Sequence, residues 1–371
     1  MNFQPFAGIK VVDLTSNIAA PFSGAILADL GAEVVHVESL AGDDSRRMAP
    51  RIGDISAYWQ VVNRNKSVIR LDIREPEDRK SLDLLLSEAD VFITNLRPDK
   101  LQRNKLDYQS LKTQFPRLIH AALSAYGAAG AESNRAGYDA VLQARTGIAE
   151  ITGTSDGPPV RTGVSVLDIG AGTWLALAII TSLYSRQTTG QGASVATSLF
   201  ETGANWVAYH VAANQISGKP SGRHGSGHPA FSPYGIFPTK SSPVCIGIGG
   251  DSIFTIFCSA LGLESLLEDE KFSTNPARVA NDQELRRLIE ARLSEISGED
   301  AVKILDAVGV PCDIVQKPEA LLQDPQSIAT KMMMSVDVEG FGPLHFPALP
   351  ITFDGNRPAN NSGESKQWGA K

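Results

Sequence analysis

The chain has 371 residues, of which 42% are hydrophobic and 20% are charged, and its formal net charge is -7. These values are typical of a globular protein with one or two cores and exclude a disordered or low-complexity chain. The acidic balance argues against a nucleic-acid partner, because such a partner requires a basic surface.

The N-terminal third of the chain alternates strand-like and helix-like segments. Runs of β-branched residues predict strands at 10–14, 33–37, 68–73, 90–94 and 117–124. Apolar residues at helical spacing predict helices at 19–30, 79–88 and 108–114. The short connections imply parallel strands with right-handed crossovers. This alternation predicts a Rossmann-like large domain, that is, an α/β fold with an open, doubly wound parallel sheet.

The middle of the chain has a different pattern. It predicts one more strand at 164–167 and two long helices at 171–186 and 197–215. The most apolar run in the first of these helices, 174–184, is shorter than the roughly 20 residues that cross a bilayer. We therefore expect no association with a membrane.

The second half of the chain predicts a smaller α+β domain. Segment 217–233 is rich in Gly, Ser, Pro and His and is typical of a linker. A strand at 244–248 follows, with helices at 252–261, 281–296 and 299–308 and a β-rich tail at 332–353. We expect a large domain over 1–216 with 330–371, a linker and glycine loop over 217–233, and a small domain over 234–329.

Cysteine usage and the N-terminus bear on localisation. Cys245, Cys258 and Cys312 are widely spaced and form no metal-binding pattern, which favours free thiols in a reducing compartment. The first residues contain no basic segment followed by an apolar one, so we expect no secretory signal. The protein is expected to be cytoplasmic.

Asp168 stands at the predicted junction between strand 164–167 and the helix that follows it. A carboxylate beside a helix N-terminus is favoured by unpaired N–H groups and by the helix dipole. Gly170 and Gly172 would leave room for a ligand near the backbone. Asp168 could thus be an ionised, accessible nucleophile, or it could be an ordinary N-cap; the local pattern leaves both interpretations open.

Other motifs narrow the choice of ligand. The turn after the first strand, 15–21, contains no glycine, so a dinucleotide site for NAD or FAD is not expected. Arginines recur near predicted strand ends, where doubly wound sheets bind ligands, and a cluster of them would suit a phosphorylated ligand. Each one alone can equally be a solvated surface residue. These arginines are Arg70, Arg74, Arg97, Arg103 and Arg135.

Segment 225–229 could be a mobile loop over a site or a plain linker. His224 and His228 have no carboxylate or cysteine at ligand spacing, so no metal site is expected there.

Several stretches in fixed order resemble the family III CoA-transferases, the carnitine dehydratase/bile-acid-inducible type that includes formyl-CoA transferase and 2-methylacyl-CoA racemase. They extend over nearly the whole chain. They are 8–15, 27–35, 63–67, 89–91 with 95–98, 137–139 with 143–144, 223–225 with 228–229, and 309–312 with 324–326.

The resemblance implies roles for named residues. Asp168 falls at the catalytic aspartate of the family, and Gly225, Ser226, Gly227 and His228 fall at a loop that closes over it. Arg74, Arg103 and Arg135 match positions that hold the phosphates or adenine of CoA. The remaining implied CoA contacts are Ile18, Ala19, Leu71, Asp72, Ile73, Asn95, Leu96, Arg97, Gly137, Tyr138 and Asp139.

The resemblance also implies an activity and an assembly. It implies an interlocked homodimer that moves CoA from an acyl-CoA thioester to a carboxylic acid through aspartyl anhydride and aspartyl-CoA intermediates, without a metal or NAD. The chain departs from the family pattern at Ile18, where transferases have glutamine, and at Ser39-Leu40, where they have arginine; Arg46 or Arg47 could replace that arginine. A 2-methylacyl-CoA racemase and a non-catalytic acyl-CoA-binding protein remain alternatives. Tyr138 replaces the racemase histidine and supplies no base near neutral pH, which disfavours the racemase.

Overall fold

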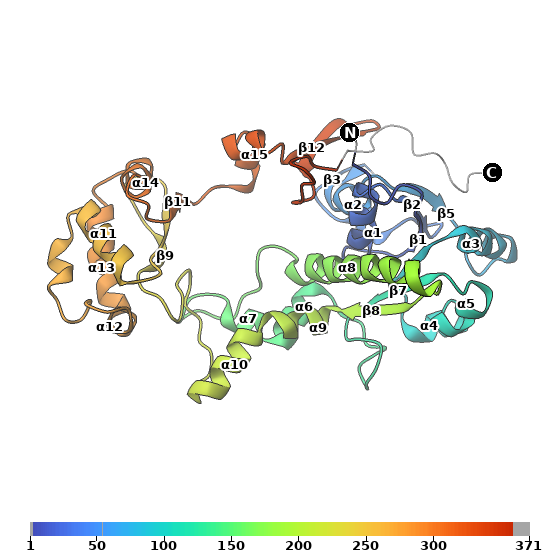
Figure 1. The fold of residues 1–371 in the computed structure, drawn as a ribbon, viewed down its shortest axis with the longest axis horizontal. Coiled ribbons are helices and arrows are strands. Elements are labelled where there is room, and N and C mark those ends of the chain that lie inside the picture. Colours follow the sequence, from blue (N-terminus) through green and yellow to red (C-terminus); the bar gives the residue numbers. More distant parts are fainter. Residues whose placement is uncertain (1–2, 54, 359–371) are drawn as a thin grey trace. The chain divides into compact units, whose positions relative to one another are not determined.

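The computed structural model describes residues 3–53 and 55–358, which form two compact units (Figure 1). The first unit comprises the chain up to residue 148, residues 162–212 and the chain from residue 322; the second comprises 149–161 and 213–321. Segment 149–161 groups with the second unit, whereas the sequence-based limits assign it to the large domain. The last part of the predicted large domain, 359–371, lies outside the described residues.

A six-stranded parallel sheet forms the centre of the first unit, in the order β5-β2-β1-β6-β7-β8. Its strands are β1 (Lys10–Leu14), β2 (Glu33–Glu38), β5 (Ser67–Arg70), β6 (Val91–Thr94), β7 (Ile119–Ser124) and β8 (Ser194–Ser198). The chain adds β2 and β5 on one side of β1 and then β6, β7 and β8 on the other. The order therefore reverses between β1 and β6, and sheets of this kind bind ligands at that point. The predicted α/β fold with a parallel sheet is confirmed.

Helices cover the sheet because its central strands are apolar on both faces. Helices α3 (Pro76–Glu88), α4 (Pro98–Arg103) and α5 (Tyr108–Gln114) share a core with β1, β2 and β6 that includes Leu82, Leu101 and Val35. Helices α1 (Ala19–Asp29) and α8 (Val166–Thr189) pack against each other and against the sheet (Figure 1). This arrangement leaves the carboxyl ends of the strands as the edge where loops gather.

Shorter elements complete the first unit. They include helices α2 (Ala57–Asn63), α6 (Asp139–Thr146), α9 (Leu199–Trp206) and α15 (Pro325–Ala329) and the 3-10 turn η1 (Asp44–Arg47). They also include two hairpins, β3 (Arg51–Ile52) with β4 (Ile55–Ser56) and β12 (Met333–Val338) with β13 (Gly342–Pro347). The short helix α7 (Ile148–Ile151) and helix α10 (Ala208–Ser217) lead from it into the second unit.

The second unit is an α+β fold with its own core. A three-stranded antiparallel sheet, β11-β10-β9, is formed by Cys312–Ile314, Val244–Gly247 and Tyr234–Phe237. Helices α11 (Asp251–Leu261), α12 (Asn275–Ala280), α13 (Asp282–Leu293) and α14 (Gly298–Asp306), with the turns η2 (Glu264–Leu267) and η3 (Pro318–Leu322), complete the unit. Its core is rich in phenylalanine and leucine, including Phe257, Phe272 and Leu285.

Two expectations for the middle of the chain are wrong. The predicted strand 164–167 does not form, because α8 begins at Val166. The predicted helix 197–215 is preceded by β8, which was missed, and is divided into α9 and α10. Helix α8 has 24 residues and contains an 18-residue window with a mean hydropathy of 1.7, so by length and composition it could cross a membrane. It packs against α1, β7 and β8 as a core helix does, so this property is weak evidence for a membrane span.

Candidate active site

Asp168 lies in the first turn of α8, three residues after the N-cap position at Ser165. The Ser165 side chain makes no capping hydrogen bond. The buried Asp139 carboxylate, at the start of α6, instead accepts hydrogen bonds from the backbone N–H groups of Leu167 (2.7 Å) and Asp168 (3.2 Å). Asp139 therefore caps α8 from a distant part of the chain, and the interpretation of Asp168 as an ordinary N-cap is wrong.

The Asp168 carboxylate is left without a partner. It is half-buried, and among the described residues it makes no hydrogen bond or ion pair. Burial raises its pKa to about 7, and the nearby charge of Asp139 adds to this effect. Because Asp139 already occupies the positive end of the helix, Asp168 is not held fully ionised as expected from sequence. Both protonation states are populated near neutral pH, which is a common property of functional carboxyls.

The two glycines after Asp168 serve packing. A Cβ atom at Gly170 would lie 2.3 Å from the Trp206 ring of α9, and one at Gly172 would lie 2.4 Å from the backbone oxygen of Ala19 in α1. The expectation that they make room for a ligand is therefore wrong. Residues 168 and 172 lie on one face of the helix because they are four apart. Asp168 thus shares the face of α8 that contacts the start of α1.

A cleft of about 760 Å³ lies at the carboxyl ends of β1, β2, β5 and β6, where the strand order reverses. The structure brings seven of the predicted CoA contacts together here: Leu71, Asp72, Ile73, Arg74, Asn95, Leu96 and Arg103. The cleft also contains residues that sequence reasoning did not single out for this role: Leu14, Thr15, Ser16, Val37, Glu38, Ala41, Gly42, Asp43, Asp44, Lys100 and Asn104. Their position directly after strand ends is a signal that could have identified several of them.

Four cationic side chains line this cleft: Arg47, Arg74, Lys100 and Arg103. Arg74 pairs with Asp72 at 2.6 Å and Arg103 with Asp99 at 3.6 Å, but both guanidinium side chains remain largely exposed, at 81% and 74%. They can therefore still bind an anion. Hydrogen bonds from Arg74 also lower the pKa of Asp72 to about 2.

The structure also distinguishes the two arginines that follow β2. Arg46 is bound to Glu38 at 2.8 Å and stacks over the Trp59 ring at 3.8 Å. Arg47 pairs with Asp44 but lines the cleft and is half exposed. Arg47 is therefore the candidate for the phosphate contact left open by the sequence.

The other predicted contacts lie outside the cleft lining. Arg97 lies near Asp99 (3.7 Å), and Arg135 pairs with Glu132 (2.6 Å) and lies over the Tyr126 ring. Ile18 is the N-cap residue of α1, and Ala19 begins that helix, directly after the cleft-lining turn. Gly137, Tyr138 and Asp139 lead into α6 beside the start of α8, with Tyr138 68% exposed.

The glycine loop belongs to the second unit, where residues 225–228 line a cavity of about 470 Å³ together with Arg223, Asp282 and Arg286. The amide of Gly225 donates to the Gly153 oxygen and that of Gly227 to the His224 oxygen, both at 2.8 Å. Neither amide is free to stabilise an oxyanion in this conformation. In the described part of the chain, no group of three or more His, Cys, Asp or Glu side chains is arranged to hold a metal ion.

The stretch 63–67, which carries part of the family resemblance, has a structural role. Arg64 pairs with Asp29 of α1 at 2.6 Å, and the Asn65 side chain donates to the same carboxylate. The fully buried Lys66 ammonium lies 2.7 Å from the Asp13 carboxylate of β1. These ion pairs hold the segment between α2 and β5 against α1 and β1.

Comparisons with known proteins identify the family of the chain. The family model described as CoA-transferase family III matches residues 6–364. Succinyl-CoA:glutarate CoA-transferase of Homo sapiens is 34% identical over 355 residues, covering 95% of this chain and 81% of that protein. Acetyl-CoA:oxalate CoA-transferase of Acetobacter aceti is 32% identical over 353 residues, with 95% and 90% covered. The crystal structure of a CAIB/BAIF family protein from Brucella suis is 34% identical, with a TM-score of 0.87 over 97% of this chain and 95% of that one. The chain therefore belongs to CoA-transferase family III and is an enzyme of CoA transfer.

Proposed function

We propose that the enzyme moves CoA from an acyl-CoA to a dicarboxylic acid, with Asp168 as the nucleophile. The observation that carries the role of Asp168 is its half-buried carboxylate, which has no partner among the described residues while Asp139 holds the helix end. The proposal for the acids rests on the relatives, whose names specify glutarate and oxalate. Both are dicarboxylates.

The reaction follows from a carboxylate nucleophile. Ionised Asp168 attacks the thioester carbonyl carbon of the acyl-CoA, the C–S bond breaks, and the CoA thiolate leaves a mixed anhydride. The thiolate then attacks the aspartyl carbonyl of the anhydride, which releases the first acid and forms an aspartyl-CoA thioester. The incoming carboxylate displaces CoA to form a second anhydride. The thiolate finally attacks the acyl carbonyl of that anhydride, which gives the new acyl-CoA and frees Asp168.

The cleft at the strand ends is proposed to bind CoA. Arg47, Arg74, Lys100 and Arg103 supply positive charge for its phosphates, and Leu71, Ile73 and Leu96 supply apolar surface beside them. The turn after β1 lines this cleft and leads directly into α1, whose first residue contacts α8 at Gly172. This route connects the cleft with the face of α8 that carries Asp168.

The cleft arginines yield a kinetic prediction. The double variant Arg74→Ala with Arg103→Ala should raise the KM for acyl-CoA by about 100-fold or more, because each lost charge-assisted contact to a phosphate contributes about 1.5 kcal/mol or more. The kcat should stay within about twofold, since neither side chain contacts the reacting carbon in the proposed mode. Steady-state kinetics checks this, with Arg117→Ala as control, because Arg117 is exposed outside the cleft and donates to Gly190. An equal effect of the control would contradict the assignment.

We also propose that the chain forms a homodimer, and that it acts in the cytoplasm. Support for self-association comes from α8 and the helices after it, where large apolar side chains are exposed: Leu177 (51%), Tyr184 (79%) and Tyr209 (55%). Such surface is normally covered by a partner. Three free cysteines accord with a reducing compartment.

A cross of acyl-CoA donors with acid acceptors tests the function. Succinyl-CoA and acetyl-CoA, each combined with glutarate, oxalate and a monocarboxylate of equal chain length, should give exchange with the dicarboxylates at least about tenfold faster, since the second carboxylate adds a charge-assisted contact. Deuterium incorporation at the α-carbon of 2-methylacyl-CoA without any acid would indicate a racemase instead. Binding of CoA with no exchange across the whole panel would indicate a non-catalytic binding protein.

A further inference from the structure

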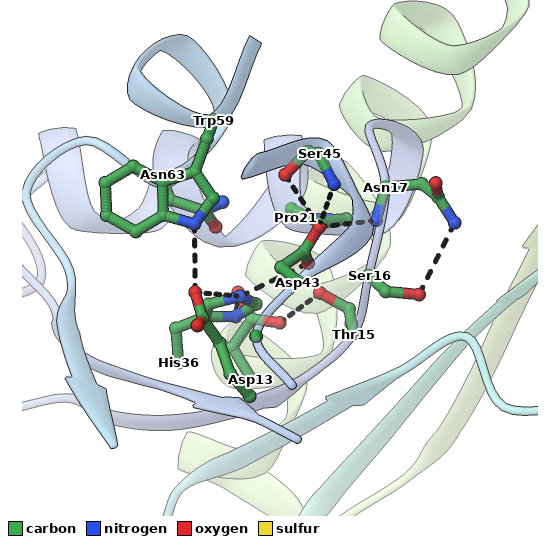
Figure 2. Close-up of polar contacts among 12 residues, drawn as sticks. Asp13, Thr15, Ser16, Asn17, Pro21, His36, Asp43, Ser45, Trp59 and Asn63 are labelled. Carbon is green, nitrogen blue, oxygen red and sulfur yellow. Dashed lines mark hydrogen bonds and ion pairs between the residues drawn. The ribbon is translucent and has the colours of Figure 1, made fainter. Parts of the chain in front are cut away.

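His36, in β2, is fully buried between two carboxylates below the cleft (Figure 2). Its Nδ1 atom lies 3.5 Å from Asp13 Oδ2, and its Nε2 atom lies 3.5 Å from Asp43 Oδ2. Glu38 Oε1 is 3.9 Å from the same Nε2 atom. A neutral imidazole carries one N–H group, so one of its nitrogens would place a lone pair against a carboxylate. Only the imidazolium presents an N–H group to both sides.

The charge balance of the cluster leads to the same conclusion. Three carboxylates are buried together, those of Asp13, Glu38 and Asp43. Lys66 neutralises Asp13 at 2.7 Å, and Arg46 neutralises Glu38 at 2.8 Å. Arg70, on the exposed rim, is 3.7 Å from Glu38 and adds to that pair.

Asp43 is thus the carboxylate that needs His36 as its cation, because an unpaired buried charge is costly. Burial opposes a charge on the imidazole, but Asp13 and Asp43 outweigh burial and the repulsion from Lys66 and raise the pKa of His36.

Asp43 connects two loops that line the cleft. Its Oδ1 atom accepts hydrogen bonds from the backbone N–H groups of Asn17 (3.3 Å) and Ser45 (2.6 Å) (Figure 2). Asn17 has a left-handed backbone (φ 68°), which non-glycine residues rarely adopt without support. Asp13, on the other side of His36, accepts a hydrogen bond from the hydroxyl of Thr15 in the same turn. The two acids that flank His36 therefore both hold the turn after β1.

We propose that His36, as a buried imidazolium, is a positioning residue that holds the turn after β1 and the loop after β2 in the geometry that binds CoA. The inference rests on the proposed CoA-binding role of the cleft. The polar neighbours of His36 are Asp13, Glu38 and Asp43, and none of them belongs to α8. Its loss should therefore weaken acyl-CoA binding and leave the chemistry at Asp168 intact. The same weakening should appear in the wild-type enzyme at alkaline pH, once His36 loses its proton.

Three variants and one direct measurement test the role. His36→Gln removes the charge, and His36→Lys restores a buried cation between the two acids. His120→Gln is the matched control, because His120 is a buried histidine of β7 whose Nε2 atom lies 3.0 Å from the Leu106 oxygen, away from the cleft lining. Steady-state kinetics gives KM and kcat, calorimetry gives the Kd of CoA, and NMR of the wild-type imidazole reports its protonation state.

We expect His36→Gln to raise the KM for acyl-CoA and the Kd of CoA about tenfold, with kcat within about twofold, because the cleft loops lose the ion pairs at 3.5 Å that hold them in the binding geometry. His36→Lys should recover most of the affinity, and His120→Gln should leave it unchanged. Equal effects of the two glutamine variants, or a neutral His36 ring at pH 7, would overturn the inference. If wild-type enzyme fails to bind CoA, the proposed function of the cleft is wrong; if it binds and His36→Gln binds equally well, only the role of His36 is wrong.

Discussion

Replacing Asp168 with alanine should lower kcat for CoA transfer by about 10⁴-fold or more while the protein stays folded and binds CoA. Every step of the proposed route passes through this carboxylate, and removing a covalent nucleophile typically costs this much. Folding should persist because Asp139 caps α8, and the Asp168 side chain makes no hydrogen bond or ion pair within residues 3–53 and 55–358. Exchange between an acyl-CoA and a free acid measures kcat, and calorimetry measures CoA binding.

Two further observations make this test specific. Hydroxylamine added with acyl-CoA should convert Asp168 of the wild-type enzyme to a hydroxamate that mass spectrometry locates, because both proposed intermediates are activated aspartyl groups. The wild-type rate should rise with pH through about 7, as burial holds the proton on Asp168 below that pH. Asp313→Ala, at an exposed position of β11, is the control and should retain full activity. Turnover by Asp168→Ala within tenfold of wild type would refute the mechanism.

Replacing Asp168 with asparagine should make the protein more stable, and the gain should grow with pH. The carboxyl ionises near 3.8 in the unfolded chain and near 7 in the folded protein. Between these values the folded state keeps a proton that the unfolded state has lost, so stability falls as pH rises and the loss is complete above about pH 7. Asparagine has no such titration. The free energy of unfolding of the variant should exceed that of the wild type by up to about 4 kcal/mol at pH 8 and by little at pH 4. Solvent around the half-buried group reduces this difference.

Urea unfolding of both proteins at pH 4, 6 and 8 measures this gain. Asp107→Asn should show the opposite dependence of stability on pH. Asp107 is the N-cap residue of α5, and its carboxylate accepts a hydrogen bond from the Ser110 amide. Burial of Asp107 opposes ionisation, but hydrogen bonds from the Ser110 hydroxyl and amide outweigh it and lower its pKa. Its loss should therefore destabilise the protein more at neutral pH than at acid pH. A stability difference for Asp168→Asn that does not change with pH would show that the carboxyl titrates normally.

The fold of the N-terminal third could be predicted because local sequence patterns determine its strands and helices. Strands such as 10–14 and 119–124 are short and rich in buried apolar residues, and a helix such as α3 buries one face, so both signals are strong. The region around 164–198 failed for physical reasons. Segment 164–167 contains two valines, but its last two residues belong to α8, whose N-terminus is capped by Asp139, nearly thirty residues earlier. Strand β8 is a short edge strand of Ser, Ala, Thr and one Val, paired only with β7, and it has no strong hydrophobic pattern.

The site shows the same division between local and distant causes. Arg74 and Arg103 were found because arginines near strand ends meet at one edge of a parallel sheet, whereas Asn95 was implied by the family resemblance. The raised pKa of Asp168 could not be found, because it depends on burial and on Asp139, which tertiary packing brings together. Gly170 and Gly172 were assigned to ligand access, yet their requirement comes from Trp206 and Ala19 on other helices. A glycine in a sequence does not reveal which atom approaches it.

The buried pairs of the 63–67 segment have a consequence for sequence divergence. Arg64 and Asp29 are 35 positions apart, and Lys66 and Asp13 are 53 positions apart, yet each pair shares a site closed to water. Loss of either member strands a charge in the interior, which typically costs about 3–5 kcal/mol. Viable change at these positions must therefore occur in both partners together. Among homologous sequences, the two members of each pair should be substituted together, and neither member should vary alone.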